Sequence, residues 1–475
     1  MNSILKNSKI TIHFIGIGGI GMSGIAELML DQGFNIKGSD IFLNENIKRL
    51  RKKGAKIFLK HHKNNVKNIS AAVFSSAIKK TNTEIVECNK LSIPLVSRAS
   101  MLAELMRNKN SIAIAGSHGK TTTTSLVGTM LESSKLDPTI INGGVINAYS
   151  KNNKLGLGNW MVVEADESDG SFLKLPHEIN IVTNIDSEHL DYYQTNKNLI
   201  NSFEKFINNI PFYGYSIICT DNISAYKLSK KINTRKIITY SQNKQDSDVK
   251  ITNIKNKGHK SLFTIVIKKN ILKKYSGSYS FESNILGKHN VSNATGAIIA
   301  SLLAGASIDN IKKSLKYFKG VKRRFTFLGI INKASIYDDY AHHPTEIKAS
   351  YDIAKILTKK RIIIIFQPHR YSRTHQLYNL FLKILKKIDI LFVLDIYPAG
   401  EKALKNINSE KLVKDLNRKR NNKAFWISNN LEINKLLKPY YQEENTIIFM
   451  GAGSVTHQAY KLIKQNNVQE NSRNI

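Results

Sequence analysis

The sequence predicts an α/β protein of three domains, and three observations support this fold class. The chain has 475 residues, enough for about three domains of roughly 150 residues each. Short apolar runs alternate with stretches of helical spacing, the pattern of strand–helix–strand units and parallel sheets. Several apolar runs end directly in glycine-rich or polar loops, as strands do where a parallel sheet carries its binding site. The expected domains span residues 1–106, 107–319 and 320–475.

Composition restricts the class of protein further. The formal net charge is +35, but the lysines are scattered instead of gathered with aromatic residues on one element. We therefore expect no nucleic-acid partner, although a basic surface favours a polyanionic small substrate. No apolar run approaches the roughly 18 residues that predict membrane insertion, and Met1–Lys9 lacks the apolar core of a signal peptide. Two distant cysteines, Cys88 and Cys219, suit a reducing compartment, so we expect a cytoplasmic protein.

The first domain opens with a predicted strand, Lys9–Ile15, that leads into the glycine-rich turn Gly16–Gly21 and a helix, Met22–Gln32. A second strand then delivers Asp40, which follows Gly16 by 24 residues. This order is typical of dinucleotide-binding folds, in which the glycines grip a pyrophosphate and the acid holds a ribose. Alone it indicates a nicotinamide-dependent dehydrogenase. Uridine diphosphate also carries a pyrophosphate, so the motif leaves the nucleotide open.

The rest of the first domain is predicted to be a small parallel sheet with helices on both faces. His61 and His62 sit in a charged loop and are expected to be solvated. A helix over Arg98–Met106 leads into the next domain. The remaining predicted strands are Ile57–Phe58, Ala71–Ala77 and Pro94–Val96.

The second domain is organised around a predicted phosphate-binding loop. A buried strand ends at Ala115, and the chain then runs through Gly116-Ser117-His118-Gly119-Lys120-Thr121 into a helix. Glycines let backbone N–H groups turn toward phosphates, and the helix N-terminus adds partial positive charge. Lys120 would reach the β- and γ-phosphates and Thr121 would hold Mg²⁺. The usual pattern has a glycine where Ile114 stands, so the loop alone leaves a nucleotide site and a chance match equally open.

Polar residues at the ends of two further strands fit the same edge of the sheet. Glu164 follows a buried strand, and a carboxylate beside a phosphate loop is where Mg²⁺ is usually held. A helix N-cap would explain Ser168 or Asp169, but not Glu164. His189 follows the next strand and is expected on the same rim. Further on, Asn290, Asn293 and Ala297 share one face of a predicted helix, and two amides there suit an adenine edge.

The third domain repeats the pattern of buried strands that end in polar clusters, so its site is expected at the strand ends. The strand Arg361–Phe366 leads to Arg370 and Arg373. Two arginines three residues apart suit an anionic carboxylate or phosphate held bidentately. The other predicted strands are Ser335–Tyr337, Ile390–Leu394 and Thr446–Met450.

Taken in order, these motifs resemble those of the Mur ligases over essentially the full chain. The ordered set is far more specific than any one of its members. It comprises Gly16–Glu27, Gly116–Thr124, Glu164–Phe172, Thr183–Tyr193, Gly287–Ala297, Gly320–Phe325, Asp338–Glu346, Phe366–Thr374, Asp395–Glu401 and Gly451–Gly453. The resemblance implies an ATP-dependent ligase that forms peptide bonds in peptidoglycan precursor synthesis. It implies an N-terminal Rossmann-like domain that binds a UDP-sugar, a central P-loop domain that binds ATP, and a C-terminal Rossmann-like domain that brings an amino acid.

The resemblance also implies roles for individual residues. Thr121 and Glu164 would hold one Mg²⁺ and His189 would contact a second. The expected catalytic residues are Lys120, His189 and His342, with His342 as the candidate base. The ATP set is Gly116, Ser117, His118, Gly119, Lys120, Thr121, Thr122, His289, Asn290, Asn293, Arg324 and Asp339; the UDP-sugar set is Gly16, Gly18, Gly19, Gly21, Met22, Ser23, Asp40 and Ser76; and the amino-acid set is Tyr340, His342, Arg370 and Arg373.

Within the family, Gly18–Gly24 favours the branch that adds L-alanine to UDP-N-acetylmuramate over the branch that attaches a ready-made peptide to the same sugar in recycling. The chemistry agrees, because a carboxylate is a poor acyl donor until the γ-phosphoryl group of ATP is moved onto it. The expected cofactors are ATP and Mg²⁺, and the expected state is a monomer or weak homodimer. A dehydrogenase remains the alternative from another class, although it has no use for the second phosphate site.

Overall fold

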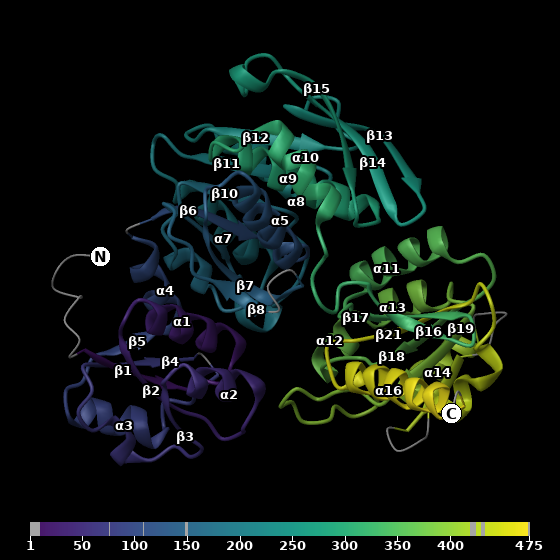
Figure 1. Cartoon of the computed structure of the whole chain (residues 1–475), viewed down its shortest axis with the longest axis horizontal. Coiled ribbons are helices and arrows are strands. Elements are labelled where there is room, and N and C mark those ends of the chain that lie inside the picture. The colour runs from purple at the N-terminus through teal and green to yellow at the C-terminus, as the bar shows by residue number, and fades with distance from the viewer. Residues whose placement is uncertain are drawn as a thin grey trace. The chain divides into compact units, whose positions relative to one another are not determined.

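The computed structural model describes residues 10–75, 77–107, 109–147, 151–418, 424–428 and 433–473 (Figure 1). The chain forms two compact units. The first comprises Met1–Lys255 and Ser261–Lys319, and the second comprises Asn256–Lys260 and Gly320–Ile475. The first unit contains two sheets and the second unit one, so the α/β class predicted from the sequence is confirmed.

The first sheet has five parallel strands in the order β3-β2-β1-β4-β5. Phe14 of the central strand packs in one core with α1, whereas Ile15 packs in another with Ile85 of α3. Both faces of this strand are therefore covered, which explains why it is continuously apolar from Phe14 onward. The elements are β1 (Thr11–Ile15), α1 (Ile20–Asp31), β2 (Asn35–Ser39), α2 (Glu45–Lys52), β3 (Lys56–Phe58), β4 (Ala71–Phe74), α3 (Thr83–Lys90), β5 (Leu95–Ser97) and α4 (Arg98–Met106).

The second sheet has ten strands in the order β15-β14-β13-β12-β11-β10-β6-β9-β7-β8. In Figure 1, β13, β14 and β15 lie at the end of this sheet away from β7 and β8. The strands are β6 (Asn110–Ala115), β7 (Thr139–Ile146), β8 (Lys151–Lys154), β9 (Trp160–Glu164), β10 (Ile179–Val182), β11 (Tyr215–Cys219), β12 (Ile237–Ser241), β13 (Val249–Lys257), β14 (Lys260–Ile267) and β15 (Gly277–Ser283). The helices are α5 (Lys120–Ser133), α6 (Leu190–Tyr193), α7 (Asn196–Asn208), α8 (Ile223–Lys231), α9 (Lys288–Leu303) and α10 (Ile308–Tyr317).

The third sheet has the order β16-β17-β21-β18-β19-β20 and is parallel except where β16 pairs with β17. Four neighbouring strands of this sheet are almost wholly buried, as the unbroken apolar run of β18 predicts. The elements are β16 (Thr326–Ile331), β17 (Ala334–Asp339), α11 (Pro344–Leu357), β18 (Ile362–Phe366), α12 (Tyr371–Gln376), α13 (Tyr378–Leu385), β19 (Ile390–Leu394), α14 (Ser409–Asn417), β20 (Ala424–Ile427), α15 (Ile433–Leu437), β21 (Thr446–Met450) and α16 (Val455–Arg473).

One expectation about the first domain is wrong. His62 is exposed, but only 16% of the His61 side chain is exposed. Its Nδ1 lies 3.2 Å from Oε2 of Glu84 and 2.9 Å from Oγ of Ser39. Helix α3 carries Glu84 into the interior beneath the ends of β1 and β2, and the buried carboxylate gathers polar partners from several elements, including His13 at 3.3 Å. Local charge around His61 does not reveal this distant partner.

None of the helices that the structure describes combines the length and the apolar character needed to cross a membrane. The strands and helices thus provide three sheet edges at which polar loops collect.

Candidate active site

The phosphate loop predicted from the sequence forms at the middle of the ten-stranded sheet. β6 lies between β10 and β9, and the parallel registers pair Ala115 with Val182 and Ile114 with Glu164. The loop and the polar residues after the two neighbouring strands therefore meet at one edge. Gly116 has φ +136°, and a Cβ there would overlap the Oγ1 of Thr183, so this position requires glycine.

The loop is tied to the chain that follows β10. The backbone N–H of Ser117 donates to the Asn184 carbonyl at 3.2 Å, and the N–H of His118 donates to the Asn184 side chain at 2.9 Å. Thr183 in turn donates to the His118 carbonyl at 2.6 Å. In the described part of the chain, the amides from residue 119 to residue 122 have no protein acceptor. These amides and the α5 N-terminus form a site ready for phosphate oxygens.

Lys120 is partly buried, with 14% of its side chain exposed, and acidic residues lie close to its Nζ. Its Nζ donates to the Gly116 carbonyl at 2.7 Å and lies 2.7 Å from Oε2 of Glu167. Burial tends to lower the pKa of Lys120, but the charges of Glu167, Asp166 and Glu164 outweigh it and raise that pKa. Lys120 is therefore charged at neutral pH. Glu167 was not among the predicted site residues; its place in the acid run after β9 was the available signal.

Glu164 lies where the sequence predicts a metal-holding carboxylate. Its Oε1 accepts from the Thr121 hydroxyl at 3.1 Å and its Oε2 accepts from the Gly143 amide at 2.6 Å. Burial raises the pKa of Glu164, with the charge of Lys120 opposing. A carboxylate and a hydroxyl oxygen are ligands that Mg²⁺ accepts, and a partly buried carboxylate with a raised pKa gains from an added cation. This pair fits the predicted magnesium site.

His189 belongs to a second group of possible ligands. Donor atoms of Glu167, Glu188 and His189 all lie within 4.8 Å of one another. His189 has φ 57°, in the left-handed region, and its Nε2 is 3.6 Å from Glu167. Such a backbone conformation is costly for a non-glycine residue and is often found at functional sites. Glu167 thus stands between Lys120 and the second candidate metal site.

The predicted amide face of α9 contacts the phosphate loop itself. A Cβ on Gly119, whose φ is +85°, would lie 2.5 Å from Oδ1 of Asn293. Asn293 also donates to Asn290 at 3.4 Å, and Asn290 donates to the Leu286 carbonyl at 2.7 Å. Thr122 is buried in the first turn of α5, whereas His289 is exposed. Both asparagines therefore lie on the side of α9 that meets the loop.

The glycine turn of the first domain has a different hydrogen-bond pattern. The amides of Gly16 and Ile17 both donate to the Ser39 carbonyl, at 2.8 and 3.0 Å. The Gly18 amide donates to Oδ2 of Asp40 at 2.8 Å, and Gly19 donates to the Gly16 carbonyl at 3.3 Å. The acid expected to hold a ribose thus also braces the turn.

Other predicted UDP-sugar residues lie in the same region. Met22 and Ser23 are buried, and the Ser23 hydroxyl donates to the Ile20 carbonyl at 3.0 Å. Gly21 lies beside the side chain of Arg98, a residue that the sequence analysis did not select. Ser76 lies outside the described residues.

The second unit collects the residues predicted to bind an amino acid. The ring of His342 is 5.2 Å from that of Tyr340 and 5.6 Å from that of His369. Nδ1 of His342 lies 3.0 Å from the Tyr340 carbonyl, so a proton there leaves Nε2 as an acceptor. Burial lowers the pKa of His342 to about 3, with Arg373 acting in the same direction. His342 is therefore neutral at pH 7.

Arg373 and Arg370 both follow β18. Arg373 donates to Nδ1 of His369 at 3.3 Å, and Nη1 of Arg370 is 3.8 Å from Glu401. The ring of His369 stacks on that of Tyr397 at 5.4 Å. His369, Tyr397 and Glu401 were not predicted individually. They join the site because β18 and β19 are neighbours, which places the loops after them side by side.

Two residues predicted to face ATP from the third domain make local contacts. Asp339 is buried and accepts from the Ser350 hydroxyl at 2.6 Å and from the Ala341 amide at 2.9 Å. Burial raises its pKa to about 6 despite these hydrogen bonds. Arg324 lies over the Tyr340 ring at 5.3 Å and donates to Glu346 at 3.4 Å.

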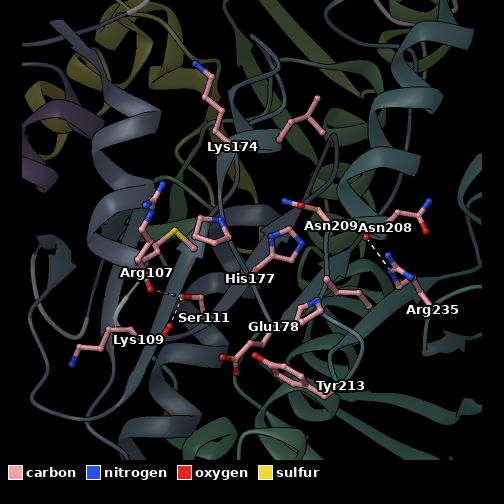
Figure 2. Close-up of a pocket in the computed structure, with 15 residues that line it drawn as sticks. Arg107, Lys109, Ser111, Lys174, His177, Glu178, Asn208, Asn209, Tyr213 and Arg235 are labelled. Atoms are coloured by element: carbon pink, nitrogen blue, oxygen red, sulfur yellow. Dashed lines mark hydrogen bonds between the residues drawn. The ribbon is translucent and has the colours of Figure 1, made fainter. Parts of the chain in front are cut away.

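The first unit also contains a cavity of about 630 Å³, whose lining residues are drawn in Figure 2. It lies away from the edge of the ten-stranded sheet that carries the phosphate loop. It is lined by Ser111, at the start of β6, and by Glu178, which precedes β10. These positions are at the opposite ends of the strands from the phosphate loop. His177, labelled in the same view, is buried there, and burial lowers its pKa to about 4. The cavity is therefore separate from the nucleotide site.

A phosphate loop flanked by carboxylates, a glycine turn in a preceding domain and a third α/β domain are features that the chain shares with the Mur ligases, and the chain belongs to this family. The model described as "Mur ligase family, catalytic domain" matches residues 11–110. Those described as "Mur ligase middle domain" and "Mur ligase, glutamate ligase domain" match residues 114–301 and 323–453.

Individual relatives are similar over nearly the whole chain. A UDP-N-acetylmuramate–L-alanine ligase from Methylocella silvestris is 46% identical, with 95% of this chain and 96% of the relative covered. The enzyme of the same name from Mesorhizobium japonicum is 45% identical, with 96% and 97% covered. Among solved structures, a UDP-N-acetylmuramate–alanine ligase from Thermotoga maritima matches with a TM-score of 0.81 at 25% identity, covering 97% of this chain and 100% of that chain.

Proposed function

We propose that this protein joins L-alanine to the carboxylate of UDP-N-acetylmuramate, at the expense of ATP, in peptidoglycan precursor synthesis. The observation that carries the proposal is the phosphate loop with its partly buried, charged Lys120 beside Glu164 and Glu167. Full-length relatives at 46% and 45% identity carry the name of this reaction. We further propose that the reaction takes place in the cytoplasm.

Lys120 and the amides that follow it bind the phosphates of ATP. Thr121 and Glu164 would hold one Mg²⁺, and Glu188 and His189, with Glu167, would hold a second. Bound Mg²⁺ supplies positive charge that neutralises the phosphates as the γ-phosphoryl group leaves. The substrate carboxylate attacks the γ-phosphorus and ADP leaves, which gives an acyl phosphate. The amine of alanine then attacks the acyl carbon, loses a proton and expels inorganic phosphate, which forms the amide bond. Asn290 and Asn293 bind the adenosine part of the nucleotide from α9.

His342 has a narrower role than that of a strong base. With a pKa of about 3 it is neutral, but it holds a proton only weakly. We propose that its Nε2 accepts a hydrogen bond from the alanine amine and orients the lone pair. Arg373 and Arg370 bind the alanine carboxylate, and the Tyr340 ring closes one side of the pocket.

The test is release of phosphate from ATP by the purified protein in the presence of Mg²⁺. Release should require both UDP-N-acetylmuramate and L-alanine, and chelation of the metal should abolish it. D-Glutamate should not replace L-alanine. Equal release with D-glutamate, or release without the UDP-sugar, would overturn the proposal.

A recycling ligase that attaches a ready-made peptide to the same sugar is the second candidate. A solved murein peptide ligase from Psychrobacter arcticus shares the fold at a TM-score of 0.72, so the fold alone does not separate the two reactions. The same assay separates the two reactions, because turnover with a ready-made tripeptide in place of L-alanine would support the recycling reaction.

A further inference from the structure

Arg98 lies against the glycine turn of the first domain. It is the first residue of α4, and a Cβ built on Gly21 would be 3.2 Å from its Nη1 and 3.3 Å from its Cδ. The arginine side chain therefore crosses the first turn of α1, at a point where any side chain on residue 21 would crowd it. Gly21 admits a guanidinium in addition to shaping the turn.

Among the residues that the structure describes, none offers the charge of Arg98 a partner at hydrogen-bonding distance. The side chain is partly buried, yet among the described residues its guanidinium makes no hydrogen bond or ion pair. Arg49 and Arg107, by contrast, contact Glu27 and Glu104 at 3.0 and 3.2 Å. A guanidinium presents five donors, and partly burying them without acceptors is costly. Arg98 is placed for an anion that the protein does not itself supply.

The glycine turn has few donors left for a pyrophosphate. The four amides from residue 16 to residue 19 donate within the domain, two to the Ser39 carbonyl, one to Asp40 and one to the Gly16 carbonyl. In the described part of the chain, the amides of Gly21 and Met22 have no protein acceptor. The open donors of the turn thus lie in the first turn of α1, which is where Arg98 lies.

We propose that Arg98 binds the pyrophosphate of the UDP-sugar and is the main cationic contact of that site. The inference rests on the proposed function and names a specificity residue for it. The planar fork of arginine grips two phosphate oxygens at once, which a lysine cannot do. The adjacent amides of Gly21 and Met22 complete the anion site.

Binding of UDP-N-acetylmuramate and of UDP-N-acetylglucosamine, measured by calorimetry on the full chain, tests the proposal. The second sugar nucleotide has the same pyrophosphate but no carboxylate. Arg98→Ala should weaken both ligands by about 10- to 100-fold, as expected for a lost charge-assisted hydrogen-bond pair. Arg98→Lys should give an intermediate loss. ATP affinity and the melting temperature should stay unchanged.

The matched control is Arg107→Ala, at the C-terminal end of the same helix. Equal losses in the two arginine variants would overturn the proposal in favour of a general charge effect. A loss confined to UDP-N-acetylmuramate would also overturn it, because Arg98 would then bind the sugar carboxylate. Arg98-dependent binding of both ligands without alanine-dependent turnover would leave the pyrophosphate contact standing and refute the proposed reaction.

A second variant tests the contact without removing the arginine. Gly21→Ala places a methyl group 3.2 Å from Nη1 and should displace the guanidinium, weakening both ligands several-fold. If this effect acts through Arg98, Gly21→Ala should cost little more once Arg98 is alanine. Fully additive losses in the double variant would contradict the proposed contact.

Discussion

The chain contains two glycine turns that follow a buried strand and precede a helix. They differ in which of their backbone N–H groups remain available to an anion. In the turn at residues 116–119, two amides donate to Asn184, and the amides of residues 119–122 have no acceptor among the residues that the structure describes. In the turn at residues 16–19, all four amides donate within the domain. Both turns contain glycines at close spacing, so the motif alone does not separate them.

The difference shows that glycine spacing determines the path of the backbone but not which groups accept hydrogen bonds from its N–H groups. The turn at residues 116–119 leaves amides available and is followed directly by the partly buried Lys120. The first turn uses its amides to secure itself to the end of β2, and a neighbouring helix brings Arg98 to it. Four predictions test this contrast between the turn at residues 116–119, which leaves amides available, and the turn at residues 16–19, whose amides donate within the domain.

The largest effect on turnover is expected at the turn at residues 116–119. Lys120→Ala removes the only side-chain cation in contact with that turn among the described residues, and turnover should fall by about 1,000-fold or more. Phosphate release under saturating substrates measures it. Lys174→Ala is the control, because that exposed lysine lines the cavity at the opposite sheet edge. Turnover within a few-fold of wild type in Lys120→Ala would refute the role of Lys120.

The backbone of the two turns should respond differently to a methyl group. Gly116 has φ +136° with Thr183 in the way, so Gly116→Ala should lower stability by about 2–4 kcal/mol. Gly19 has φ −61° and its nearest neighbour would be 3.6 Å away, so Gly19→Ala should stay within about 1 kcal/mol. Thermal unfolding measures both, and similar losses would remove the distinction.

The contact between Glu84 and Ser39, whose carbonyl accepts from the first two amides of the turn at residues 16–19, should stabilise the protein less at low pH. Glu84 accepts from the Ser39 hydroxyl at 2.5 Å, and burial is outweighed by His13, Ser39 and Asn65, so its pKa falls to about 2. A depressed pKa contributes stability above the unfolded value near 4.5 and loses it as pH falls toward 2. Glu84→Gln should thus cost about 2 kcal/mol at pH 7 and progressively less below pH 4.5.

Unfolding at several pH values measures this difference, with the exposed Glu45→Gln as the control that should change little. If the free energies of unfolding of wild type and Glu84→Gln still differ by the same amount at pH 2, the charge of Glu84 is not what stabilises this region. ATP affinity should not change in Glu84→Gln, because that site does not rely on the first turn.

The smallest effect concerns His342 in the second unit. Because its pKa is about 3, it stays neutral across the assay range and should add no inflection to kcat/KM for L-alanine between about pH 5.5 and 8. His342→Gln keeps a donor and an acceptor and should lower kcat/KM by about 10-fold. An inflection near pH 6.5 that disappears in this variant would show that His342 titrates.

Much of the candidate site could be predicted from the sequence because parallel strands end at one edge. Lys120, Glu164 and His189 each follow a buried run, and the registers of β9, β6 and β10 bring them together. Glu167 was missed because nothing in a run of acids tells which one turns toward the lysine. Residues His369 and Tyr397 were missed because their contact depends on which strands are neighbours.

The sequence by itself determined the strand-and-turn units, the two glycine motifs and the family, because these follow from local periodicity and from the order of motifs along the chain. Only the tertiary structure decided which amides of each turn remain open, and that Arg98 and Glu84 serve the first turn. Hydrogen-bond partners such as Asp40, Ser39 and Asn184 come from elements distant in sequence. Their choice is set by packing, which no single stretch of the chain encodes.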